Sequence, residues 1–260
     1  MLDHRDLKEP SLFTPENLLR EARRQKSIPR AQIPQVCLLD PDGDIVRYLV
    51  GSGAATPNRN WACYHTEMFD CKLGSANVGI VGNAVGAPFA VLVAEEMFAS
   101  GCHLLLSLTS AGRISERPEL PRFLVISTAL RDEGTSDRYL KKDEASHLAA
   151  GLLGAVRPVL NDSPLPLGIG TSWTTDAPFR ETARAIGRAR KLGVDCVEME
   201  AAALYAFAQA RRKKVVCMAH VTNSMARSHG DFEKGAENGS VDSLNLIRFI
   251  LRALGHLRGA

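Results

Sequence analysis

Two glutamates flank a methionine directly before an alanine-rich run. The segment reads Val197-Glu198-Met199-Glu200 and continues with three alanines. Side chains two residues apart in an extended segment point to the same side, so Glu198 and Glu200 are expected to face one way. Carboxylates accept bidentate hydrogen bonds, which suits the vicinal hydroxyls of a sugar. Taken alone, the segment is explained equally well by two acids on a solvated face.

Polar or glycine-rich residues also follow three apolar runs that have the length of buried strands. These segments are 82–88 after the run 78–81, 109–113 after the run 103–108, and 171–179 after the run 167–170. Ligands of parallel sheets bind at the carboxyl ends of the strands, so the three segments are candidates for one site. The first leads into a helix start, whose free N–H groups suit an anion or sugar hydroxyls. The third offers Trp173 and Phe179 to a flat base.

Strands and helices alternate from about residue 36 onward. Short apolar runs separated by helical segments indicate a central, mostly parallel, twisted sheet that is covered on both faces. The expected strands are 36–39, 78–81, 103–108, 124–128, 167–170, 194–197 and 215–221, and the expected helices are 89–100, 145–156, 181–191, 200–212 and 243–257. The predicted fold class is α/β, a single-domain three-layer α/β/α arrangement with a mixed sheet over residues 36–260.

Residues 1–35 are expected to form a helical extension before this domain. Thr14, Pro15 and Glu16 combine a hydroxyl cap, a proline in the first turn and an acid facing the helix dipole. Basic residues gather at the far end of the same helix. The segment therefore predicts an amphipathic helix packed on the larger body.

Composition excludes several classes of function. The 260 residues carry 32 basic and 29 acidic side chains, a net charge of +3, so no nucleic-acid partner is expected. No apolar stretch approaches the roughly 20 residues of a membrane span, and the first ten residues lack the apolar core of a secretory signal. The six cysteines form no CxxC pair and are expected to be buried free thiols of a cytoplasmic protein. No metal or cofactor is expected, because the histidines form no paired motif.

The segment that begins at Glu198 resembles the Glu-Met-Glu-Ala-Ala signature of the nucleoside phosphorylase and nucleosidase superfamily. That superfamily includes hexameric-type purine nucleoside phosphorylase, uridine phosphorylase and methylthioadenosine nucleosidase. Other segments resemble family motifs in the same order: 82–88 the glycine loop, 110–112 the Gly-Ser-Ala-Gly turn, 131–136 the Glu-Gly-Thr-Ser segment, and 174–179 the Ser-x-Asp-x-Phe base-pocket stretch. Asn223 lies where the family places its catalytic acid or asparagine. The match covers about residues 36–257 and implies the family fold.

The resemblance implies cleavage of the N-glycosidic bond of a purine or uridine nucleoside, through a state with positive charge on the sugar. Glu200 would hold the ribose 2′ and 3′ hydroxyls, Glu198 would help at the 2′ hydroxyl, and Met199 would pack under the sugar. The other implied site residues are Asn223 as a catalytic group, Trp173, Asp176 and Phe179 at the base, Ser110, Ala111 and Gly112 along the substrate, and Gly86, Asp42 and Ser110 on the phosphate or water side. Inorganic phosphate is an expected co-substrate, and a homo-oligomer, either a dimer or a hexamer, is expected.

The chain departs from the family at the phosphate arginines. Gly43 stands where a Gly-Asp-Pro-x-Arg turn has its arginine, and Ser107 stands at the arginine of Arg-Val-Gly-Ser-x-Gly. A third arginine, which a neighbouring subunit usually lends, has no counterpart near residues 64–67. A dianion in a partly dry site needs charged donors, so the loss favours a phosphate-independent nucleosidase.

Candidates for the missing roles lie nearby in the sequence. Arg47, Arg113 or His65 could substitute for the arginines, and Asp40, Asp42 or Asp44 could supply a base that activates water. An ordinary aspartate-rich turn explains the same three acids.

Asn223 is a second departure, because purine-cleaving members of the nucleosidase and hexameric types protonate the base with an aspartate there. An asparagine amide only donates a hydrogen bond, as in the uridine phosphorylase pattern. His220 and Arg227 flank the position. Three hypotheses stay open: a nucleoside-cleaving enzyme that uses phosphate or water, a non-catalytic nucleoside-binding protein, and an enzyme acting on a modified base.

Overall fold

The computed structural model describes residues 7, 9–117, 120, 122–141, 143, 145–223 and 233–255. The strands are β1 (Val36–Asp40), β2 (Ala55–Pro57), β3 (Phe69–Leu73), β4 (Ala76–Gly82), β5 (Leu104–Arg113), β6 (Phe123–Asp132), β7 (Ala145–His147), β8 (Leu167–Thr175), β9 (Cys196–Glu198) and β10 (Lys214–Asn223). The α-helices are α1 (Pro15–Lys26), α2 (Asp44–Gly51), α3 (Ala87–Ala99), α4 (Ala150–Val156), α5 (Ala183–Lys191), α6 (Ala201–Arg211) and α7 (Ser240–Ala253). Four 3₁₀ turns join them in this part of the chain: η1 (Ser136–Arg138), η2 (Arg157–Asp162), η3 (Pro178–Arg180) and η4 (Ala236–Gly239).

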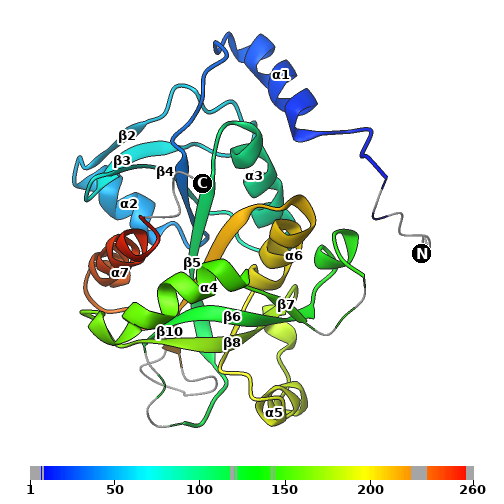
Figure 1. The fold of residues 1–260 in the computed structure, drawn as a ribbon, viewed down its shortest axis with the longest axis vertical. Coiled ribbons are helices and arrows are strands. Elements are labelled where there is room, and N and C mark those ends of the chain that lie inside the picture. The colour runs from blue at the N-terminus through cyan, green and yellow to red at the C-terminus, as the bar shows by residue number, and fades with distance from the viewer. Residues whose placement is uncertain are drawn as a thin grey trace.

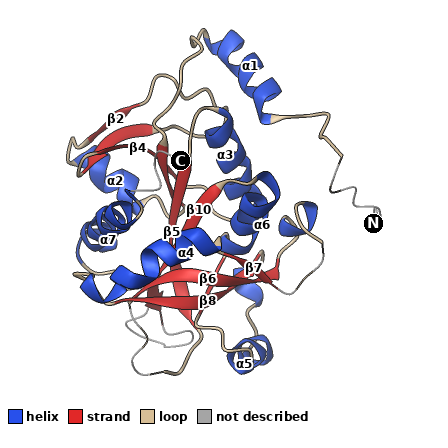
Figure 2. Ribbon diagram, in the orientation of Figure 1, coloured by secondary structure: helices blue, strands red, loops and turns tan. Residues whose placement is uncertain are grey.

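Strand β5 is the centre of one mixed sheet. It pairs in parallel with β1 and β10 and antiparallel with the short β9. Strand β10 pairs with β6, β6 with β8, and β8 with β9, so these strands and β5 form a closed ring. Strands β4, β3 and β2 extend the sheet beyond β1 as an open edge. In Figure 2, β6 and β8 run across the lower part of the view, and β5 is oriented roughly vertically.

Helices cover the sheet on both sides, as the apolar runs predict. Helices α3 and α6 pack against each other on one side of β5, and α2 and α7 lie together on the other (Figure 1). Helix α6 is buried from Ala201 to Ala208, which explains why its sequence is apolar all round. The α/β fold class with a mixed sheet is confirmed.

The N-terminal helix begins as predicted. The Thr14 hydroxyl accepts a hydrogen bond from the Asn17 N–H at 3.3 Å, and Pro15 is the first helical residue. Leu19 and Ala22 are buried against the body. All six cysteines are free and buried, which confirms that they form no disulfide and are not exposed. Within the described ranges, no helix has the length and hydropathy of a membrane span.

Two local predictions are wrong. The helix expected over 145–156 is a strand at residues 145–147 and a helix only from Ala150, because Ala145–His147 add β7 to the edge of β6. The buried Ser146 hydroxyl donates to the Ala202 carbonyl at 2.8 Å, a tertiary bond that the local sequence does not show. The segment 110–112, which was expected to be a turn because it resembles the family's Gly-Ser-Ala-Gly turn, is instead extended at the end of β5, where it pairs with β10. Helix α2 and strands β2 and β3 were not predicted.

Candidate functional site

Glu198 is the last residue of β9, and its carboxylate is hydrogen-bonded to other groups of the protein. Its side chain is buried, and its two oxygens accept hydrogen bonds from the hydroxyls of Ser172 and Thr174 and from the N–H groups of Glu200 and Ala201. Both backbone bonds measure 2.7 Å, so the carboxylate caps the N-terminus of α6. Glu198 therefore joins β8, β9 and α6, and its acceptor positions are largely used.

Glu200 has a different environment, although it is only two residues away. It precedes the first turn of α6 and is 2% exposed. Its Oε1 accepts the Gly86 N–H at 2.7 Å, which ties it to the loop before α3. Its Oε2 is buried and has no hydrogen-bond partner in the structure, while the Thr109 hydroxyl lies close enough to the carboxylate to oppose the rise of its pKa. A buried acceptor without a partner is costly, so this oxygen is the one that a ligand hydroxyl can satisfy.

Burial raises the pKa of both carboxyl groups. For Glu200 the nearby charge of Glu198 adds to the effect of burial, and the pKa rises to about 8. The four hydrogen bonds that Glu198 accepts oppose the shift of its own pKa. Near neutral pH the protonated form of Glu200 therefore predominates in the free protein, and a positive charge developing beside it would favour the ionised form.

Asp42 lies after β1 and is bound to the end of β5. Its carboxylate accepts the Ser110 N–H at 2.9 Å and the Ser110 hydroxyl at 3.1 Å. Lys234, in the segment before η4, donates to Asp42 at 3.1 Å and to Asp44 at 2.6 Å. Burial alone would lower the pKa of Lys234, but the hydrogen bonds and charges of Asp44 and Asp42 outweigh it and raise the pKa. Lys234 was missed by sequence reasoning, because a single lysine in a polar stretch carries no motif.

The turn before α2 holds Gly43 in a left-handed conformation that strains any residue with a side chain. Gly43 has a φ of +75°, and a Cβ atom at this position would lie 2.3 Å from Oδ1 of Asn83. The buried Asp40 carboxylate accepts the Val46 N–H at 2.9 Å and so caps α2. The predicted aspartate-rich turn therefore also starts a helix, and its first acid has a structural use.

Burial raises the pKa of Asp40 to about 7 from an ordinary value of 3.8. The folded protein then binds more protons than the unfolded chain across this interval, so the free energy of unfolding should fall as the pH rises through it. Because an asparagine side chain cannot titrate, Asp40→Asn should make this fall shallower, although Glu200 still contributes a fall of the same sign. Urea unfolding at a series of pH values measures it, with the exposed Asp162→Asn as the control. An unchanged slope would contradict the shifted pKa.

The other candidate cations do not converge on Ser110. Arg47 is exposed and pairs with Asp44, while the Arg113 guanidinium bonds the carbonyls of Ser115 and Arg117. His65 is exposed and lies beside the Phe89 ring.

His220 is buried and accepts a hydrogen bond from Arg122 at 3.0 Å. Burial, then the charge of Arg122, lowers the pKa of His220 to about 4, so its ring is neutral. Among the described residues, Lys234 is the cation bonded to the carboxylate on Ser110.

The residues expected at the base lie at the ends of β8 and β6. The Trp173 indole N–H donates to Asp132 at 2.9 Å, and Asp176 accepts the Gly134 N–H at 3.0 Å. These bonds join the 131–136 segment to the 174–179 segment. Phe179 is 99% exposed in η3. Since Ser172 and Thr174 point toward Glu198, the intervening Trp173 lies on the opposite face of β8.

Gly112 brings the remaining predicted residues near β9. It pairs with Val197 of β9 and with Asn223 at the end of β10. Ala111 is buried, and Met199 is half-buried between the two glutamates. Arg227 lies outside the described residues. The structure thus brings together Asp42, Gly86, Ser110, Glu198 and Glu200, and places Asn223 one strand away.

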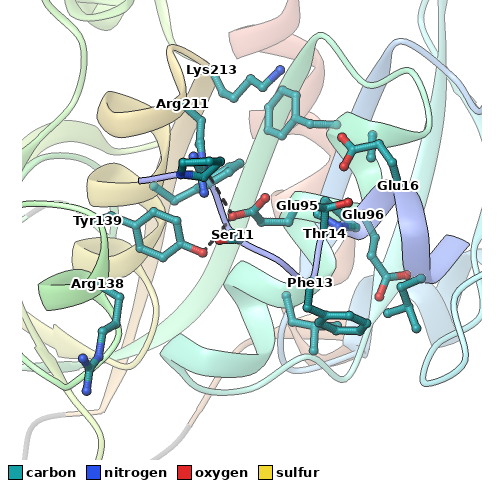
Figure 3. Close-up of a pocket in the computed structure, with 17 residues that line it drawn as sticks. Ser11, Phe13, Thr14, Glu16, Glu95, Glu96, Arg138, Tyr139, Arg211 and Lys213 are labelled. Atoms are coloured by element: carbon teal, nitrogen blue, oxygen red, sulfur yellow. Dashed lines mark hydrogen bonds and ion pairs between the residues drawn. The ribbon is translucent and has the colours of Figure 1, made fainter. Parts of the chain in front are cut away.

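A separate cavity of about 650 Å³ lies between the segment before α1 and helices α3 and α6 (Figure 3). Tyr139 donates to Glu95 at 2.8 Å there, and Arg211 lies 3.8 Å from the same oxygen. None of the predicted site residues lines this cavity. In the described part of the chain, no three histidine, cysteine or acidic side chains form a group that could hold a metal ion.

The family model described as the phosphorylase superfamily matches residues 36–254. The chain belongs to this superfamily and is an enzyme of it.

Purine nucleoside phosphorylase DeoD-type 1 of Shewanella oneidensis is 29% identical over 161 residues, which are 61% of this chain and 68% of that protein. The fold resembles the crystal structure of uridine phosphorylase from Vibrio fischeri with a TM-score of 0.69 and 19% identity, covering 87% of this chain and 91% of the other. It also resembles the methylthioadenosine and S-adenosylhomocysteine nucleosidase of Campylobacter jejuni with a TM-score of 0.69 and 15% identity, covering 84% and 98%.

Proposed function

We propose that this enzyme cleaves the N-glycosidic bond of a nucleoside and that Glu200 binds the ribose hydroxyls. The observation that carries the proposal is the buried Glu200 carboxylate, which has one oxygen on Gly86 and the other without a partner. The sequence relative named purine nucleoside phosphorylase and the structural neighbour named uridine phosphorylase support the reaction class.

Glu200 acts by charge as well as by hydrogen bonding. Positive charge grows on the sugar as the glycosidic bond breaks, and an ionised carboxylate beside it stabilises that state. Glu198 contributes mainly by fixing the backbone from which Glu200 extends, because its own oxygens accept four hydrogen bonds within the chain. Met199 packs under the sugar.

The leaving base gains electron density and needs a hydrogen-bond donor. The Asn223 amide supplies one to a carbonyl or ring nitrogen, and Asp176 and Phe179 border the base, whereas Trp173 faces the other side of β8. Both purine and uridine nucleosides are candidate substrates.

A base-release assay with a panel of purine and pyrimidine nucleosides, run with and without inorganic phosphate, tests the reaction. Release from at least one nucleoside is expected. Nucleoside binding without any release would favour the non-catalytic alternative and overturn the proposal.

The dependence of kcat/KM on pH gives a second test. Because burial and Glu198 raise the pKa of Glu200 to about 8, kcat/KM should rise with pH through this value, as the ionised form becomes the major one in the free enzyme. Initial rates below saturation, measured in overlapping buffers, give the profile. A profile that is flat from pH 6 to pH 9 would remove Glu200 from the ionisation that controls the rate.

We also propose a homo-oligomer. Phe13 (Figure 3) and Leu92 are exposed apolar side chains that line the cavity of about 650 Å³ between the segment before α1 and helices α3 and α6. Val85 is exposed in the loop that binds Glu200 through Gly86. Light scattering on the purified protein measures the state, and a monomer that retains full activity would contradict the proposal.

A further inference from the structure

Helix α5 and the turn before it carry a local concentration of positive charge. Residues 180–191 contain five basic side chains and one acidic side chain, a net charge of +4, whereas the net charge of the whole chain is +3. The rest of the chain is therefore nearly neutral, and the total charge, from which no nucleic-acid partner is expected, does not describe this segment. In Figure 1, α5 lies at the lower edge of the molecule. A local surface of one sign attracts polyanions even when the protein as a whole is almost uncharged.

The two faces of α5 have different surroundings. One face packs into the apolar cluster around Trp173 and consists of Ala185, Ile186 and Ala189. Arg184, Arg188 and Lys191 are spaced by four and three residues, which places them in one row on the opposite face. All three residues of this basic row are exposed. The apolar face therefore fixes the helix to the protein, and the basic row faces solvent.

The charges of the basic row are not neutralised by the described part of the chain. No described carboxylate forms an ion pair with Arg184, Arg188 or Lys191. Arg190, which lies on another side of the helix, differs in this respect, because it pairs with Glu116 at 2.8 Å. The acid of the segment, Glu181, is half-buried, and burial raises its pKa. The three cations of the row are thus available to an anion from outside the chain.

The composition and spacing of the row fit a chain of phosphates. Two of its three members are arginines, whose planar guanidinium groups bind phosphate oxygens in a bidentate manner. Neighbouring members lie about 5–6 Å apart, so the row suits anions that recur along a polymer better than one small anion.

An exposed aromatic side chain lies beside the row. Phe179, in η3 just before α5, is 99% exposed, and such a ring can stack on an unpaired base. A duplex offers phosphates but hides the faces of its bases. A bilayer would require apolar side chains of α5 to insert, and these pack into the protein instead. The surface therefore favours a single strand over a duplex or a membrane.

We infer that the basic row and Phe179 form a docking surface for single-stranded nucleic acid, with the row along the phosphates and the ring on an unpaired base. Binding is independent of base sequence, because phosphate contacts carry no sequence information. The inference goes beyond the proposed nucleoside cleavage and does not rest on it. No member of the row belongs to the candidate site, so the row can be altered without touching the residues proposed for cleavage.

Fluorescence anisotropy of a labelled single strand of about 16 nucleotides tests the inference. The triple variant Arg184→Ala, Arg188→Ala, Lys191→Ala should raise Kd at least about tenfold at about 100 mM salt. It should also make the plot of log K against log salt concentration shallower by about 2, because three phosphate contacts are lost. A control triple variant removes the same charge from exposed residues on other elements, and its changes are Arg59→Ala, Lys72→Ala and Arg157→Ala. The control should bind the strand as the wild type does.

Phe179→Ala separates stacking from charge. It should weaken binding at least about fivefold and leave the salt dependence unchanged, because stacking releases no counterions. Unchanged affinity of this variant would overturn the assignment of an unpaired base to the ring.

Three further outcomes would overturn the inference: no binding of the strand by the wild type, equal binding by the row variant and the control variant, and tighter binding of a duplex of the same length or of phosphatidylserine vesicles. Nucleoside cleavage by both triple variants should match the wild type. Because strand binding is measured without turnover, its failure is distinguishable from a failure of the proposed function.

Discussion

Glu200→Gln should lower kcat at least about 100-fold while changing KM much less. A glutamine amide can still accept the Gly86 N–H and can hydrogen-bond a ribose hydroxyl, so binding of the nucleoside survives. It cannot carry the negative charge that stabilises the developing positive charge on the sugar. Initial-rate kinetics of base release, on a nucleoside that the wild type cleaves, give both constants.

The Glu200→Gln variant should be as stable as the wild-type protein. Because burial and Glu198 raise the pKa of Glu200 to about 8, the neutral glutamine resembles the protonated form, and the free energy of unfolding should not fall. Glu116→Gln, at an exposed acid paired with Arg190, is the control for changing a carboxylate elsewhere. If Glu200→Gln retained a near-normal kcat, the ribose site would not be at Glu200.

Glu198→Ala should lower the free energy of unfolding by about 3–5 kcal/mol. Removing the carboxylate leaves two buried hydroxyls and two buried N–H groups without their acceptor, and the N-terminus of α6 without its cap. Urea unfolding monitored by circular dichroism measures the loss.

Glu198→Gln separates this structural role from a catalytic one. The amide oxygen can keep part of the bonding, so its loss of stability should be smaller than that of the alanine variant. Exposed Glu9→Ala should leave stability within about 0.5 kcal/mol of the wild type. A stable Glu198→Ala protein would show that other groups cap α6.

The order of strands and helices could be predicted because the core residues of this fold lie in short, continuous apolar runs of the sequence. Leu104–Leu106 and Val215–Cys217 are nearly unexposed in paired strands, and their sequences indicate this directly. The polar ends of the same strands could not be assigned, since Thr109 and Ser110 are extended only because β10 pairs with them. The helix predicted over residues 145–147 is wrong for the same reason, because pairing with β6 makes these residues a strand.

Some features of the candidate site could likewise be predicted from the local sequence, and others could not. The signature segment and the Ser110 segment were recognisable by residue type, and the structure brings them close together with Gly86. The unequal environments of Glu198 and Glu200 were not predictable. Their spacing of two residues predicts only that both side chains point to the same side, whereas in the structure the Glu198 carboxylate caps the N-terminus of α6. Lys234 and Asp42 are 192 residues apart in the sequence, and no local sequence pattern predicts a contact at that distance.

The closed ring of strands has a consequence for how the chain acquires activity. Strand β5 completes its pairing only after β10, which lies about a hundred residues later in the sequence, has been synthesised and has paired with it. Contacts so distant in sequence slow folding, because much of the chain must be ordered before they form. A nascent chain still lacking Lys214–Asn223 has unpaired edges on β5 and β6, the kind of exposed surface that chaperones shield during translation. Catalytic competence should therefore appear only after β10 has left the ribosome and paired with β5 and β6.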